Sequence, residues 1–155
     1  MKEFKGGFTG KGKSIAIVIS RFNEAISKNL LNGAVDCLTR NGVAEDSIDV
    51  YWTPGSFEIP TVLATLTRKS KKYAGIVALG CIIRGETPHF EYIASEVSKG
   101  IANVSISTGI PIGFGIITAD TVEQAKDRAG VKSGNKGWDS AMAVLEMTDL
   151  LNQIQ

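Results

Sequence analysis

Histidine and cysteine are scarce in this sequence. Its 155 residues include one histidine and two cysteines, Cys37 and Cys81, which lie far apart and fit no CxxC or Cys/His spacing. Zinc sites and redox pairs depend on such spacings, so neither is indicated. Cys37 falls in a helical pattern and Cys81 in an apolar strand pattern, where a cysteine usually behaves as a small hydrophobic residue. We therefore expect no metal site and no redox cofactor.

A strong charge of one sign and a long hydrophobic run are also missing. Lys and Arg number 17 against 16 Asp and Glu, which leaves a net charge of +1 and little field to attract nucleic acid or a membrane surface. The basic run at residues 68–72 has the composition of a solvated helix end. No apolar run approaches the ~18 residues of a membrane span, and residues 1–14 have no signal-peptide core. These features predict a cytoplasmic protein.

What remains is an ordinary globular composition, with 43% hydrophobic and 21% charged residues. A chain of this length is most simply one domain, residues 1–155. Residues 1–13 form a glycine- and lysine-rich arm before the first apolar segment. Its residues 4–8 could form a short strand that adds to the sheet of a neighbouring subunit by edge pairing.

Four β-branched segments alternate with segments of helical periodicity. We expect strands at residues 14–20, 48–53, 75–83 and 112–118. Helices are expected from residue 23 to about 41, from 60 onward, over 89–107, briefly from 121, and over 138–152. The alternation and the nearly continuous apolar strands predict a three-layer α/β/α fold with a four-stranded parallel sheet.

Local signals mark where three of these helices begin. Asn23 is a candidate side-chain cap for the first helix, and Pro60 suits the first turn of the second. Thr121 to Gln124 has the pattern of a capping box.

Unusual residues follow each predicted strand. Ligands of open α/β sheets collect at the carboxyl ends of the strands, and four motifs fall there. They are RFN at residues 21–23, PGSFE at 54–58, RGETPH at 84–89 and DT at 120–121. This placement predicts a ligand site at that edge of the sheet.

Each candidate also has a purely structural interpretation. His89 can exchange protons near neutral pH or simply form a local hydrogen bond. Phe22 could be a hydrophobic staple, and Glu58 could complement the dipole of the next helix. Arg84 is as compatible with a structural ion pair as with ligand contact. Arg128 suits the C-terminus of a short helix, and residues 130–138 read as a flexible connection that could also bind an anion.

The turn before His89 leads into a predicted helix N-terminus. Free N–H groups at such a terminus favour phosphate, and Gly85, Glu86 and Thr87 stand there. The pattern is neither a Walker loop nor GxGxxG, and is weak by itself.

Five motifs taken together are far more specific. The sequence SRFN at 20–23, PGSFEIP at 54–60, GCIIRGETPHFEYI at 80–93, FGIITADT at 114–121 and QAKDRAGVKSGNKGW at 124–138 resembles the lumazine synthase family. The resemblance is collinear from about residue 14 to 150. It implies condensation of 5-amino-6-ribitylaminopyrimidinedione with 3,4-dihydroxy-2-butanone 4-phosphate. The products are 6,7-dimethyl-8-ribityllumazine, phosphate and water, in riboflavin biosynthesis, without a cofactor.

The resemblance also implies roles for individual residues. Phe22 stacks on the pyrimidine, the main chain of Cys81, Ile82 and Ile83 meets its polar edge, and His89 moves protons. The ribityl chain lies along Ser56, Phe57 and Glu58. The phosphate is held by Gly85, Glu86 and Thr87. Glu86 departs from the small residue common in the family, so its side chain is expected to face solvent while its amide binds.

A neighbouring subunit is expected to complete the site with Phe114, Arg128 and Lys136. Arg128 would pair with the phosphate, and Asp139 occupies an acidic position near the histidine in some relatives. The family forms pentamers, some of which assemble into decamers or hollow shells of sixty chains. The short 130–137 connection and the proline-free arm favour the shell here. The resemblance also implies riboflavin synthase as a candidate associated enzyme.

Other functions compete with this interpretation. A phosphosugar isomerase or lyase on the same fold could use His89 and the phosphate turn, but leaves Phe22 unexplained. A riboflavin-binding relative without catalysis is disfavoured by the presence of His89 and Arg128. A non-enzymatic shell or carrier protein predicts that loss of His89 has no catalytic effect.

Overall fold

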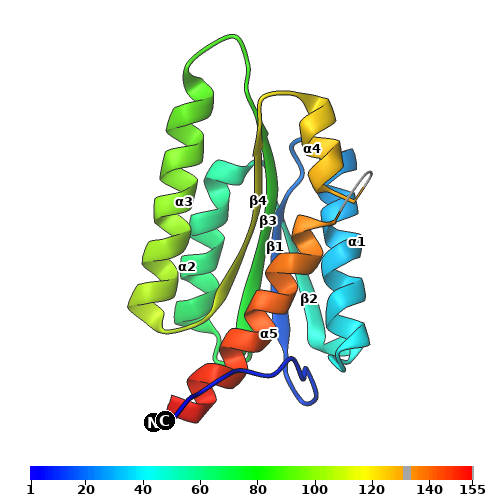
Figure 1. The fold of residues 1–155 in the computed structure, drawn as a ribbon. Helices are drawn as coiled ribbons and strands as arrows, with labels where there is room; N and C mark the ends of the chain where they lie inside the picture. The colour runs from blue at the N-terminus through cyan, green and yellow to red at the C-terminus, as the bar shows by residue number, and fades with distance from the viewer. Residues whose placement is uncertain (131–133, 155) are drawn as a thin grey trace.

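The computed structural model describes residues 1–130 and 134–154. Its sheet consists of β1 (Ile15–Ser20), β2 (Ile48–Thr53), β3 (Gly75–Ile83) and β4 (Ile112–Ala119). The strands are parallel and lie in the order β2-β1-β3-β4 (Figure 1). The predicted four-stranded parallel sheet is confirmed.

Helices cover both faces of this sheet. They are α1 (Glu24–Arg40), α2 (Ile59–Lys69), α3 (His89–Thr108), α4 (Val122–Arg128) and α5 (Lys136–Ile154), with short 3-10 turns η1 (Glu45–Ser47) and η2 (Ser56–Glu58). Figure 1 shows α2 and α3 on one side of the sheet and α1, α4 and α5 on the other. The three-layer α/β/α prediction is therefore also confirmed.

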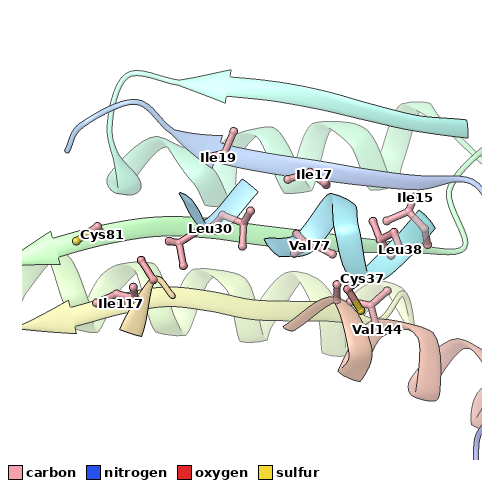
Figure 2. Packing of buried hydrophobic residues seen from close by; sticks show 14 of the residues in the cluster. Ile15, Ile17, Ile19, Leu30, Cys37, Leu38, Val77, Cys81, Ile117 and Val144 are labelled. Atoms are coloured by element: carbon pink, nitrogen blue, oxygen red, sulfur yellow. The ribbon is translucent and has the colours of Figure 1, made fainter. Parts of the chain in front are cut away.

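The core follows the alternation of side chains along the strands. Ile15, Ile17 and Ile19 of β1 face α1 and α5, while Ala16 and Val18 face α2 and α3. All five are fully buried, because β1 is a central strand covered on both sides. Figure 2 shows Ile15, Ile17 and Ile19 in this core. Each large apolar side chain buried in this way contributes about 1.5–3 kcal/mol. The buried sheet is a rigid base for the loops at its carboxyl edge.

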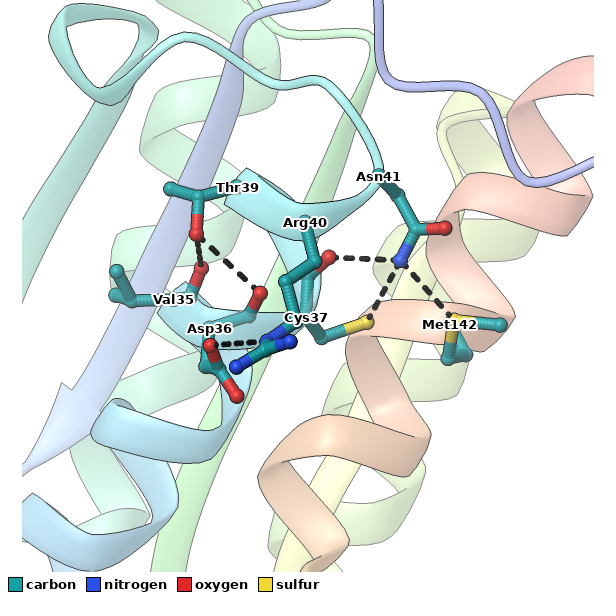
Figure 3. Close-up of polar contacts among 7 residues, drawn as sticks. All are labelled: Val35, Asp36, Cys37, Thr39, Arg40, Asn41 and Met142. Atoms are coloured by element: carbon teal, nitrogen blue, oxygen red, sulfur yellow. Dashed lines mark hydrogen bonds and ion pairs between the residues drawn. The ribbon is translucent and has the colours of Figure 1, made fainter.

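Cys37 belongs to this core, as its helical position predicts. The end of α1 is held to α5 around it, since the Asn41 amide donates to the Cys37 carbonyl at 2.8 Å and lies 3.6 Å from the Met142 sulfur (Figure 3). Burial raises the pKa of the Cys37 thiol to about 11. The thiol is a packing group here.

Most element boundaries agree with the sequence pattern, but the start of α5 does not. The helix begins at Lys136, two residues before the predicted start. The Asn135 side-chain oxygen accepts from the N–H groups of Gly137 at 2.8 Å and Trp138 at 3.2 Å. Asn135 is therefore the cap of α5, hidden in sequence by the surrounding glycines.

The other caps give one confirmation and one correction. The Thr121 hydroxyl accepts from the Gln124 N–H at 3.2 Å, as the capping box predicts. Asn23, by contrast, does not cap α1 with its side chain. Its amide donates instead to the carbonyl of Cys81 at 3.1 Å.

Residues 1–14 form no strand in the single subunit. The strand predicted at 4–8 would pair with the sheet of a neighbouring subunit, so one chain does not test it. The arm lies against the end of α5, where the Gly7 N–H donates to Asp149 at 2.6 Å and the Gln153 amide donates to the Lys5 carbonyl at 2.7 Å. Figure 1 shows the two termini side by side. Edge pairing with a neighbouring subunit needs a second copy and stays a prediction.

In the part of the chain that the structure describes, no helix combines the length and the apolar character needed to span a membrane.

Candidate functional site

A cavity of about 750 Å³ opens at the carboxyl edge of the sheet, beside α3. It brings together ten of the residues singled out from the sequence. They are Phe22, Ser56, Phe57, Glu58, Cys81, Ile82, Ile83, Gly85, Thr87 and His89. They come from the carboxyl ends of three strands and the segments that follow them, which is the convergence expected in an open α/β sheet.

The β2–α2 loop packs closely under the cavity. The Ser56 hydroxyl donates to the Ser20 hydroxyl at 3.4 Å, and both side chains are buried. Gly80 on β3 allows this approach, because a Cβ there would lie 2.6 Å from the Ser56 oxygen. The loop is thereby seated against β1 and β3, and η2 presents Phe57 and Glu58 at the surface.

Strand β3 extends past its neighbour β1. Pairing with β1 ends at Leu79, whereas pairing with β4 continues to Ile83. The Arg84 N–H donates to the Ala119 carbonyl, so the main chain of Arg84 faces β4. Since alternate residues face the same neighbour, Cys81 and Ile83 direct their main-chain groups to the side where β1 has ended. That side is the cavity.

Two aromatic rings stand exposed at the cavity. Phe22 is 69% exposed and Phe57 is 61% exposed. A hydrophobic staple would be covered by the helix it closes, so the exposure of Phe22 argues against that interpretation. Uncovered rings beside polar main-chain groups suit a flat ligand with a polar edge.

The turn between β3 and α3 is held by Arg84. Its guanidinium donates to Asp120 at 2.8 Å and to Glu91 at 3.4 Å, and lies 4.6 Å from the centre of the Phe90 ring. Hydrogen bonds to both carboxylates raise the pKa of Arg84. Of the two interpretations left open by the sequence, the structure shows the ion pair.

Beyond Arg84, the turn leads directly to the N-terminus of α3. Gly85 and Thr87 line the cavity, and His89 is the first residue of the helix. Pro88 stands at the cap position, with no side chain capping the helix. The first N–H groups of a 20-residue helix are therefore left for an anion. The side chain of Glu86 is exposed, as expected for a residue that contributes only its amide.

The cavity has five further lining residues. Gly55 lies in the PGSFE motif, whereas Phe90, Tyr92, Ile93 and Glu96 were given no role by the sequence analysis. Tyr92, Ile93 and Glu96 follow His89 at helical spacings of three, four and seven residues, so they share its face of α3. That spacing is the signal that could have found them.

Besides Glu86, three predicted residues lie outside this cavity in the single chain. Phe114, on β4, is 48% exposed, and Lys136 begins α5. Arg128, at the end of α4, donates to the Thr118 carbonyl at 2.8 Å. These are the residues expected from a neighbouring subunit, which one chain does not test. Of the predicted 130–138 loop, residues 131–133 lie outside the described residues.

Burial also decides the chemistry of Cys81, whose side chain points into the core. It raises the pKa of the thiol to about 11, so the group is neutral at physiological pH and is no nucleophile. Across residues 1–130 and 134–154, no three His, Cys, Asp or Glu side chains are grouped to hold a metal ion.

Fold and site together define an open α/β protein that binds a small molecule at the carboxyl ends of a parallel sheet. Residues 12–152 match the family model described as 6,7-dimethyl-8-ribityllumazine synthase. The chain is 54% identical over 155 residues to the protein of that name from Kosmotoga olearia, covering 100% of this chain and 99% of the relative. It is 50% identical to the one from Clostridium kluyveri, covering 100% of each. The protein thus belongs to the 6,7-dimethyl-8-ribityllumazine synthase family.

Among solved structures, a de novo designed Rossmann fold protein matches with a TM-score of 0.43 and 10% sequence identity, covering 73% of this chain and 90% of the design.

Proposed function

We infer that this protein catalyses the condensation of 5-amino-6-(D-ribitylamino)pyrimidine-2,4-dione with 3,4-dihydroxy-2-butanone 4-phosphate. The products are 6,7-dimethyl-8-ribityllumazine, phosphate and water, in riboflavin biosynthesis. Full-length similarity to enzymes named for this product supports the inference. The observation that carries it is one cavity that combines exposed rings, the main chain of β3 past the end of β1, an uncapped helix N-terminus and His89.

In this proposal, the pyrimidine binds where β3 extends past the end of β1. The exposed ring of Phe22 stacks on its face. Its polar edge meets the main chain of Cys81 and Ile83, which points to the cavity. Ile82 directs its main chain to β4, so it contributes apolar surface. These contacts explain why an apolar strand end can bind a polar ring.

The ribityl chain runs along η2. The carboxylate of Glu58 accepts from its hydroxyls, while Ser56 and Phe57 contribute main-chain and packing contacts. The buried Ser56–Ser20 contact supports this part of the proposal, because it fixes the loop that presents Glu58.

The phosphate binds at the start of α3. The N–H groups of Gly85, Glu86 and Thr87 and the Thr87 hydroxyl hold it, with the positive end of the helix dipole behind them. Arg128 of a neighbouring copy completes this subsite, since its guanidinium fork matches the phosphate oxygens.

The chemistry needs proton transfer and alignment rather than a protein nucleophile. The amine of the pyrimidine attacks the ketone carbonyl and water leaves as the imine forms. Phosphate is then eliminated, and the second amino nitrogen closes the ring with loss of another water. His89, between the two subsites, accepts and donates the protons at nitrogen and carbon. Alignment of the two substrates supplies much of the remaining rate.

The site is composite in this proposal, with Phe114, Arg128 and Lys136 contributed by the adjacent subunit. Their position outside the chain's own cavity supports this. We propose a pentamer as the unit, assembled into a 60-subunit shell in the cytoplasm, with riboflavin synthase as a candidate associated enzyme. Decamers are the alternative assembly. Sedimentation separates a shell from free pentamers of ~80–85 kDa.

Absorbance of the lumazine product tests the proposal directly. Wild-type protein mixed with both substrates should form it faster than the uncatalysed condensation. The His89→Ala variant should be slower by about 10²–10⁴-fold, the usual loss for an acid–base group, or less if the uncatalysed route contributes. Ser98→Ala, on an exposed position of the same helix, is the matched control.

No product above the uncatalysed rate would contradict the proposal and favour an isomerase or lyase. An unchanged rate in His89→Ala would favour a shell or carrier protein.

A further inference from the structure

Asn23 has an unusual backbone conformation. With φ 60° and ψ 51°, it is the one non-glycine residue of positive φ in the part of the chain that the structure describes. Asparagine tolerates this left-handed region better than most residues, but the conformation remains disfavoured. Such a conformation persists where surrounding contacts determine it, and these positions cluster at binding sites.

The side chain of Asn23 forms no capping hydrogen bond with α1, the helix that it precedes. The Asn23 carbonyl accepts from the N–H groups of Ile26 at 3.1 Å and Ser27 at 3.0 Å, which starts α1 through the main chain. The amide makes no cap, and donates to the Cys81 carbonyl at 3.1 Å. One residue therefore begins a helix and connects it to a strand 58 positions away.

This hydrogen bond lies where the sheet itself stops connecting the two segments. Pairing between β1 and β3 ends at Ile19 and Leu79. Two residues later, the Cys81 carbonyl faces the side that β1 has left, and the Asn23 amide takes the place of a main-chain donor. The left-handed backbone aims the amide there. The residue immediately before it is Phe22, whose exposed ring lies in the cavity.

We propose that Asn23 is a positioning residue that fixes the Phe22 ring relative to the Cys81 and Ile83 main chain and thereby sets the affinity for the pyrimidine substrate. It acts through its neighbours, by joining the loop that carries the ring to the strand that carries the polar contacts. This inference rests on the proposed function. It gives Asn23 a role that its capping pattern does not predict and that the cavity lining does not indicate, since Asn23 is not among the lining residues.

Two substitutions of Asn23 distinguish the effect of its side-chain hydrogen bond from the effect of its backbone conformation. Asn23→Gly keeps the left-handed conformation accessible and removes the donor. Asn23→Asp keeps the shape and puts an acceptor against the Cys81 carbonyl. We expect Asn23→Gly to raise both the KM for the pyrimidine amine and the Kd of the fluorescent lumazine product about tenfold. Asn23→Asp should raise both further, and neither should change the KM for the butanone phosphate more than about twofold.

Thr39→Ala is the matched control, because it removes a side-chain hydrogen bond at the opposite end of the same helix. It should leave both KM values unchanged. If Asn23→Gly binds the product as tightly as the wild type, the inference is wrong. It is also wrong if both KM values rise equally together with a fall in melting temperature, since that pattern indicates general unfolding. A wild-type protein that makes no lumazine would overturn the proposed function instead.

Discussion

The guanidinium of Arg84 lies 2.8 Å from the carboxylate of Asp120 and joins the ends of β3 and β4. Because the same side chain reaches Glu91 and covers the Phe90 ring, it also connects both strands to the first turn of α3. Arg84 is therefore committed to holding the turn in which Gly85 and Thr87 lie. In the proposed function, the phosphate of the substrate is therefore bound by the helix N-terminus and by Arg128 of a neighbouring copy.

Replacing Arg84 should therefore loosen the phosphate subsite without unfolding the protein. The Arg84 and Asp120 side chains are 45% and 62% exposed, so solvent screens their ion pair and it contributes little to stability. We expect Arg84→Ala to raise the KM for the butanone phosphate severalfold and to leave the KM for the pyrimidine amine nearly unchanged. Steady-state kinetics with each substrate varied in turn measures this.

Arg40→Ala provides the comparison, since Arg40 forms a similarly exposed pair with Asp36 on α1, away from the cavity. Equal effects of the two substitutions on the phosphate substrate would contradict the structural role assigned to Arg84.

Cys81 should tolerate loss of its sulfur, because its proposed contact with the substrate is made by the main chain. We expect Cys81→Ala to retain kcat within about threefold and to lose on the order of 1–2 kcal/mol of stability from the cavity left in the core. Thermal unfolding and kinetics on the same preparation test both parts. A loss of kcat comparable to that of His89→Ala would show that the thiol takes part in the reaction.

The raised pKa values of the thiols predict how stability depends on alkaline pH. Burial raises the pKa of Cys81 to about 11, above the ~8.5 of an unfolded thiol. Its contribution to stability is present below the unfolded pKa and is lost as pH rises through the folded pKa. The melting temperature of the wild type should fall between about pH 8.5 and 11, and less so in Cys81→Ala. Identical pH profiles would contradict this.

The contact between Asp149 and the N-terminal arm should weaken at acidic pH. The Gly7 N–H, followed by Gln153 and Lys13, lowers the pKa of the Asp149 carboxyl. The attachment of the arm is therefore fully present above the unfolded carboxyl pKa of ~3.9 and is lost as pH falls through the lowered value. Amide exchange at residues 3–9, corrected for intrinsic rates, should show protection at pH 6 that Asp149→Asn weakens. An arm unprotected at pH 6 in the wild type would contradict the contact.

Sequence patterns predicted the strands well because β1 and β3 are almost continuously apolar and buried, and β2 is rich in β-branched and aromatic residues. Apolar β-branched runs end abruptly at polar or glycine turns, so β2 and β3 agree with the expected bounds. The same patterns located most of the cavity, since the topology of a parallel sheet brings its strand ends together. The sequence of Phe22 to His89 therefore carries much of the site.

Sequence patterns did not predict which residues far apart in the sequence form hydrogen bonds or ion pairs with each other. Asparagine is a common helix cap, and nothing near Asn23 in the sequence indicates that its amide donates to the Cys81 carbonyl instead. Arg84 likewise finds Asp120, which is 36 residues away. Glu96 reaches the cavity only because α3 lies alongside it. In each case tertiary packing selects among contacts that local propensity allows equally.

The central claim is that one subunit supplies His89 and its neighbour supplies Arg128. Unfolding and reassembling equal amounts of the weakly active His89→Ala and Arg128→Ala variants tests it most directly. If the subunits mix at random, a site intact in both residues forms with a probability of about one quarter, so about a quarter of wild-type activity should return. Activity that stays at the mean of the two separate variants would contradict a shared site.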